Sequence, residues 1–159
     1  GPAYLRLARP ATEIITDEIE GYSFELGKGA VLRDGKDVTI IATGIMVPQA
    51  MKAAEALETD GISARVIDMH TIKPLDAELV VKAAKETGCI VTAEEHSVIG
   101  GLGGAVCELL SEVCPTPVLR LGVNDEFGRS GKAPLVLDAY GVNADGIVAK
   151  ARQALAMKK

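Results

Sequence analysis

The chain of 159 residues is long enough for one domain with a buried core. Its net charge of −5, without a basic cluster, argues against a nucleic-acid or membrane-surface partner, and no apolar run approaches the ~20 residues that span a bilayer. Aromatic residues make up only 3% of the sequence, so the core must consist mainly of Ala, Val, Ile and Leu.

The first 28 residues precede the regular pattern of strands and helices. Tyr4, Leu5 and Leu7 form an apolar patch that is too short to make a sheet by itself, and the chain begins without Met. We predict that residues 1–10 are the residual end of a preceding domain and that residues 11–28 are a linker. A single domain is then expected over residues 29–159.

Strand and helix patterns alternate along that domain. Apolar, β-branched runs predict the strands, and helical spacing with capping residues predicts the helices. In chain order we expect a strand at 29–33 that runs into a tight turn at 34–35, a strand at 38–43, a helix with Pro48 in its first turn and Gly61 at its end, a strand at 64–68, a helix from Asp76 to Gly88, a strand at 89–93, a helix from the turn at 100–104 to Val113, a strand at 117–121, and a helix from Asn143 or Asp145 to near Ala156.

This alternation predicts a three-layer α/β/α fold with a mainly parallel sheet. The first strand should lie antiparallel at a sheet edge. The three cysteines, Cys89, Cys107 and Cys114, match neither a zinc site nor a secreted disulfide framework. We therefore predict buried, reduced thiols and a cytoplasmic location.

Glu94, Glu95 and His96 follow directly on a predicted buried strand. In open α/β sheets ligands bind at the carboxyl ends of strands, and two carboxylates with an imidazole could perform acid–base chemistry. Successive strand side chains point to opposite faces, however, so Glu94 and Glu95 do not converge easily. An interface or hydrogen-bonding role for His96 is favoured over catalysis.

The glycine-rich turn at 100–104 precedes a predicted helix. Backbone amides at a helix N-terminus attract anions, so Gly100 and Gly101 are a candidate anion site. No GK[ST] follows, and a GxGxxG pattern fails because its third glycine position is Val106. The favoured alternative is that the glycines let the helix approach the sheet closely.

Two further loops carry charged residues. His70 and Lys73 could hold an anion or face a partner subunit, although a loop that only positions the next helix is favoured. In the loop at 122–132, Arg129 and Lys132 could reach a phosphate, and Phe127 suits a mobile, partner-contacting loop equally well. We find no metal-ligand spacing and no nucleophile motif.

An ordered set of motifs resembles the C-terminal domain of the transketolase family over essentially the whole chain. The most specific match is 66–76 (VIDMHTIKPLD), followed by Glu94-Glu95-His96 with the glycines of 100–103. The other matching stretches are 27–30, 38–44, 122–125 and 140–142, and residues 1–9 resemble the final strand of the pyrimidine-binding domain that precedes this domain in the family. The resemblance implies a five-stranded mixed sheet of order 1-3-2-4-5 with strand 1 antiparallel. The loops at 43–47 and 94–103 would then face each other at the switch point.

The resemblance also implies an enzyme that binds thiamine diphosphate and Mg²⁺ between two other domains. We therefore expect no catalytic, cofactor-binding or metal-binding residue in this chain, and no activity by the chain alone. The chain would support the fold and the dimer. Its expected partners are the N-terminal portion or subunit of the same enzyme and a second copy of itself, with no nucleic acid or membrane.

The region at 68–76 favours the transketolase branch, in which the full enzyme transfers ketol groups between sugar phosphates, including its split, two-chain forms. Two sister branches stay open, namely deoxyxylulose-phosphate synthase and the β subunit of 2-oxoacid dehydrogenases. A function of another class also stays open: a free-standing regulatory module that binds an anionic metabolite at the switch point.

Overall fold

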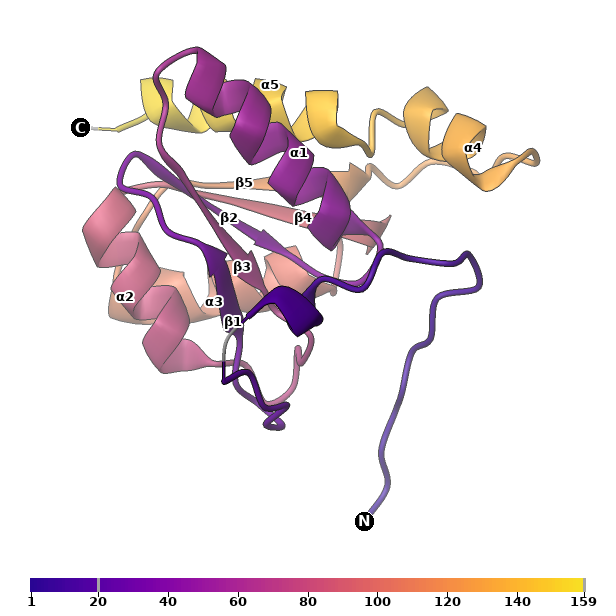
Figure 1. The fold of residues 1–159 in the computed structure, drawn as a ribbon, viewed down its shortest axis with the longest axis horizontal. Coiled ribbons are helices and arrows are strands. Elements are labelled where there is room, and N and C mark those ends of the chain that lie inside the picture. Colours follow the sequence, from indigo (N-terminus) through magenta and orange to yellow (C-terminus); the bar gives the residue numbers. More distant parts are fainter. Residues whose placement is uncertain (20, 159) are drawn as a thin grey trace.

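The computed structural model describes residues 1–19 and 21–158, which form one α/β domain preceded by an extended N-terminal segment (Figure 1). The strands are β1 (Ala30–Arg33), β2 (Val38–Ala42), β3 (Ala64–Asp68), β4 (Ile90–Ser97) and β5 (Val118–Val123). The helices are α1 (Met46–Thr59), α2 (Ala77–Thr87), α3 (Leu102–Val113), α4 (Ala133–Ala139) and α5 (Ala144–Ala156), with a 3₁₀ turn η1 (Thr16–Glu18).

The five strands form one sheet in the order β1-β3-β2-β4-β5. The edge strand β1 is antiparallel to β3, and every other neighbouring pair is parallel. The predicted fold class, strand order and antiparallel first strand are therefore confirmed.

Two apolar clusters cover the two faces of the sheet. Ile40 and Val66 belong to the cluster under α1 and α5, whereas Ile41 and Ile67 belong to the cluster under α2 and α3. All four side chains are fully buried. Because neighbouring residues on a strand face opposite ways, a strand with two consecutive apolar residues serves both clusters. Figure 1 shows the same pairs of helices on the two sides of the sheet.

The helix ends follow the predicted capping residues. Asp76 accepts a hydrogen bond from the Leu79 amide at 3.1 Å at the start of α2, and Gly88 ends that helix in the left-handed conformation. Asn143 accepts from the Gly146 amide at 2.9 Å at the start of α5. These caps define the helix bounds because they satisfy backbone groups that the helix itself leaves unpaired.

The two largest differences from the sequence prediction concern β4 and α4. The strand predicted to end at residue 93 continues as β4 to Ser97, with a register shift against β5 between Ala93 and Ser97. Helix α4 was not predicted, since it has seven residues and none of them is buried. A helix this short, whose Leu137 packs against the core but stays partly exposed, leaves no helical period of apolar residues in the sequence.

Residues 1–15 carry neither helix nor strand, and the N-terminus lies apart from the domain (Figure 1). The segment still contacts the domain, because Arg6 pairs with Glu95 and Ile15 packs against the apolar cluster under α1 and α5. The apolar side chains of Tyr4, Leu5 and Leu7 are exposed there. The division into a residual domain end at 1–10 and a linker at 11–28 stays a prediction. No helix within residues 1–19 and 21–158 combines the length and apolar character that crossing a membrane requires.

Candidate functional site

The carboxyl ends of β2 and β4 lie side by side at the centre of the sheet. Ala42 is opposite Ala93, and the Thr43 amide donates to the Ala93 carbonyl at 3.2 Å. The loops that leave these strands lead to α1 and α3, which cover opposite faces of the sheet. The switch point therefore lies where the strand order implied, and the Glu94 region is part of it.

Glu94 caps helix α3 from the end of the neighbouring strand. Its two carboxylate oxygens accept hydrogen bonds from the Leu102 and Gly103 amides, each at 2.8 Å, and only 1% of the side chain is exposed. A carboxylate at this place satisfies two otherwise unpaired donors and interacts favourably with the positive end of the helix dipole. The anion at the glycine-rich helix start is therefore the protein's own carboxylate.

The glycines of the turn leave the space that this contact needs. A β-carbon on Gly101 would collide with the Glu94 carboxylate, and one on Gly103 would lie 2.7 Å from the hydroxyl of Thr92. Gly104, by contrast, has open space around its Cα. Gly101 and Gly103 therefore allow the helix to approach the sheet closely, as predicted from the sequence.

Glu95 and His96 lie at the surface, and Nδ1 of His96 borders the same side of Gly101 as the Glu94 carboxylate. Arg6 pairs with the Glu95 carboxylate at 3.2 Å and also donates to its carbonyl at 2.9 Å. The His96 ring is exposed, with Nδ1 at 2.8 Å from the Ser97 carbonyl. The structure therefore separates the three candidate residues into one buried capping carboxylate and two surface side chains.

His70 and Lys73 lie on the loop between β3 and α2. The His70 ring packs against Phe24 with ring centres 4.6 Å apart, and its Nδ1 is 2.8 Å from the Thr71 hydroxyl. Lys73 is exposed. Burial raises the pKa of the nearby Asp68 carboxyl, an effect that the charge of His70 partly offsets.

The loop at 124–132 is fixed by contacts with the end of α4. The Tyr140 hydroxyl donates to the Phe127 carbonyl at 2.6 Å. The Arg129 guanidinium lies 4.8 Å from the centre of the Tyr140 ring, and it donates to the Ala139 carbonyl at 3.3 Å. The Phe127 side chain is left 99% exposed. Arg129 is thus engaged within the loop, and an aromatic ring is presented to the outside.

All three cysteines are free. The prediction of buried thiols is right for Cys89 and wrong for Cys107 and Cys114, which are only half-buried because they lie on the outer parts of α3 and its end. Burial raises the pKa of the Cys89 and Cys107 thiols. Within residues 1–19 and 21–158, no group of three His, Cys, Asp or Glu side chains is arranged to hold a metal ion.

Sequence reasoning did not assign the capping role of Glu94. The sequence does contain a signal for it. Glu94 stands at the end of a buried strand, and the two amides that it bonds, Leu102 and Gly103, follow eight and nine residues later at a glycine-rich helix start. Reading it required knowing that β4 continues past Ala93 and that the turn folds back over the strand end. Arg65 was also missed: it lies nearly buried in β3 and pairs with Asp34 and Glu86.

The strand order and the capped, glycine-rich helix define a three-layer α/β domain with an antiparallel edge strand. The family model "Transketolase, C-terminal domain" matches residues 27–147. The 6-deoxy-6-sulfo-D-fructose transketolase subunit SqwH of a Clostridium species is 49% identical over 154 residues, which cover 96% of this chain and 47% of that subunit. The 1-deoxy-D-xylulose-5-phosphate synthase of Heliobacterium modesticaldum is 42% identical over 96% of this chain and 24% of its own length.

A solved structure of a split-gene transketolase, described as an inactive beta4 tetramer, superposes with a TM-score of 0.89. It is 50% identical, and the alignment covers 95% of this chain and 49% of that one. The chain belongs to the transketolase family and contains its C-terminal domain. It spans about half the length of the transketolase subunit and of the split-gene chain that it matches.

Proposed function

We propose that this chain is the C-terminal section of a thiamine-diphosphate-dependent transketolase, in which the assembled enzyme transfers ketol groups between sugar phosphates. The observation that carries the proposal is the 49% identity to a transketolase subunit across 96% of this chain. The chain alone is inactive, and its role is to support the fold and the subunit assembly. Its free thiols suit a reducing cytoplasm.

The cofactor binds elsewhere in the assembled enzyme. The N-terminus of α3 does not fit the cofactor's diphosphate, because the Leu102 and Gly103 amides are already bonded to Glu94. An external anion at Gly100 and Gly101 would likewise have to displace this buried carboxylate. When bound in the other domains, thiamine diphosphate supplies the carbanion chemistry. In this chain, Glu94 holds the switch-point loop and α3 in place.

The exposed residues at the carboxyl end of the sheet form an interface with the rest of the enzyme. Glu95, His96 and Lys73 are exposed on loops or strand ends there, and His70 is half-buried against Phe24. The Arg6–Glu95 ion pair supports this role, because Arg6 belongs to the segment at 1–10 that we assign to the preceding domain. The partner is the N-terminal portion or subunit of the same enzyme.

The chain also associates with a second copy of itself as a homodimer. The split-gene transketolase at 50% identity is described as a beta4 tetramer, which supports self-association of this kind of subunit. Most soluble oligomers have closed symmetry, with twofold dimers the commonest. The N-terminal partner would join this homodimer to complete the enzyme.

A ketol-transfer assay of the assembled enzyme tests the branch. Ketose phosphate donors with aldose phosphate acceptors should be turned over in the presence of thiamine diphosphate and Mg²⁺. The second candidate is a 1-deoxy-D-xylulose-5-phosphate synthase, which the 42% identical relative favours. Turnover of pyruvate with no use of ketose phosphates would contradict the transketolase assignment and support the synthase.

A further inference from the structure

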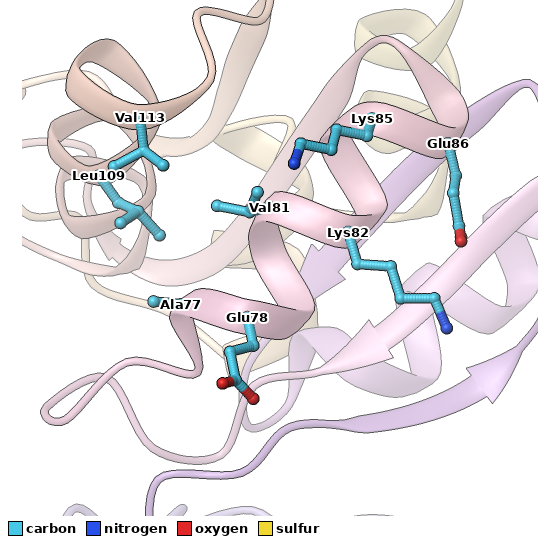
Figure 2. Close-up of a pocket in the computed structure, with 8 residues that line it drawn as sticks. All are labelled: Ala77, Glu78, Val81, Lys82, Lys85, Glu86, Leu109 and Val113. Atoms are coloured by element: carbon cyan, nitrogen blue, oxygen red, sulfur yellow. The ribbon is translucent and has the colours of Figure 1, made fainter.

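A groove of about 590 Å³ runs between the outer surfaces of α2 and α3 (Figure 2). Val81 on α2 faces Leu109 and Val113 on α3, and these three side chains form its apolar floor. Val113 is 59% exposed. Exposed apolar surface of this kind is typical of a binding interface.

The charged side chains of α2 point to two different sides of the helix. Figure 2 shows Lys85 extending towards the side of α3, whereas Lys82 and Glu86 extend to the opposite side of the helix. Glu78 lies at the other end of the groove, and its side chain is 92% exposed, with the Lys28 ammonium 3.6 Å away. Glu78 and Lys85 are separated by two helical turns, or about 10 Å along the axis. On the side of α2 that faces the groove, a carboxylate therefore lies at one end and an ammonium group at the other.

This charge pattern is complementary to itself under a twofold rotation. If α2 packs antiparallel against α2 of a second copy, about an axis midway between Val81 and Lys82, Glu78 of each copy lies opposite Lys85 of the other. The Val81 side chains of the two copies then lie beside the axis and contact each other. A parallel arrangement would instead place Glu78 against Glu78 and Lys85 against Lys85, so the charges select the antiparallel one.

We infer that the α2–α3 groove is the homodimer interface of this chain, with a second copy as its occupant and two Glu78–Lys85 ion pairs across the axis. The inference rests on the homodimer of the proposed function and names the surface that forms it. Helices of this length offer less than the ~1,600 Å² of a standard interface. The isolated chain should therefore dimerise weakly, and high salt should weaken the dimer further.

Charge reversal tests the interface in the 159-residue chain by sedimentation equilibrium. Glu78→Lys and Lys85→Glu each turn both intermolecular pairs into repulsive ones, and each should weaken association about tenfold. An equimolar mixture of the two single variants should form heterodimers about as tightly as the wild type, and the double variant should recover likewise. Lys82→Glu is the matched control on the outward side of α2 and should change association much less.

Urea unfolding of each variant shows that it remains folded. If the wild type dimerises and the single variants dimerise equally well, this interface is wrong while the homodimer stands. The interface would also be wrong if neither the equimolar mixture nor the double variant recovered the association of the wild type. A wild type that stays monomeric at every concentration would overturn both the interface and the homodimer. The groove would then be covered by another part of the assembled enzyme.

Discussion

Gly101 leaves no room for a side chain beside the carboxylate of Glu94. The β-carbon of any other residue at position 101 would overlap that carboxylate, which already bonds the Leu102 and Gly103 amides. Strand β4 and helix α3 are therefore joined by a buried, charge-assisted contact at the switch point of the sheet.

Replacing Glu94 should destabilise the domain. Glu94→Gln removes the charge but keeps one acceptor, and should cost about 1.5–3 kcal/mol. Glu94→Ala leaves two buried amides without a partner and should cost more than the Gln variant. Urea unfolding measures both. The control is Glu95→Gln, which changes an exposed neighbour and should stay within about 0.5 kcal/mol of the wild type. Equal losses at both positions would refute the capping role of Glu94.

The turn offers a matched pair of glycine substitutions. Gly101→Ala forces the Glu94 carboxylate out of place and should destabilise by about 1–3 kcal/mol. Gly104→Ala lies in α3 with open space around it, and should stabilise by about 0.5–1 kcal/mol because alanine favours the helix. The midpoints of thermal and urea unfolding should therefore fall for Gly101→Ala and rise for Gly104→Ala. The same sign for both variants would contradict the packing described for Gly101.

Asp68 gives the stability a dependence on pH. Because burial raises its pKa above the ordinary value of 3.8, the folded state holds the carboxyl proton more tightly than the unfolded chain does. Its contribution to stability is then present below that ordinary value and is lost as the pH rises through the raised pKa. Asp68→Asn should therefore gain stability relative to the wild type as the pH rises above the ordinary value of 3.8.

Asp34 provides the opposite control for that titration. A hydrogen bond from the Gly35 amide and the pairing with Arg65 lower the pKa of Asp34. Asp34→Asn should lose stability relative to the wild type near neutral pH, with the difference shrinking as the pH falls through the lowered pKa. Unfolding free energies measured across the pH series check both signs. An Asp68→Asn advantage that grows towards acid would contradict the assignment.

Tyr140 should determine the order of the loop at 124–132. Tyr140→Phe removes the hydrogen bond to the Phe127 carbonyl and should cost about 0.5–1 kcal/mol while increasing cleavage of the loop by a protease. Phe127→Ser should leave stability unchanged, since that ring is almost fully exposed. Limited proteolysis with a thermal melt makes the comparison. A large loss of stability in Phe127→Ser would mean that the ring packs within the domain.

Sequence patterns that act over a few neighbouring residues predicted the strands, the helices and their order. Asp76 and Asn143 act within three residues of themselves, so their capping roles are visible in the sequence. Glu94 bonds amides that only the folded turn brings back to the strand end, and its role could not be read locally. Arg65 looks like an outward strand residue until Asp34 and Glu86 are placed beside it. Contacts between distant segments account for what the sequence did not predict.

The central claim is that the chain is an incomplete section of a transketolase. Ketol transfer should be measured with thiamine diphosphate and Mg²⁺ for this chain alone, for the remaining portion of the enzyme alone, and for the two assembled. The account predicts turnover of ketose phosphates only in the assembled enzyme. Activity of this chain by itself, or no ketol transfer by the assembled enzyme, would contradict it.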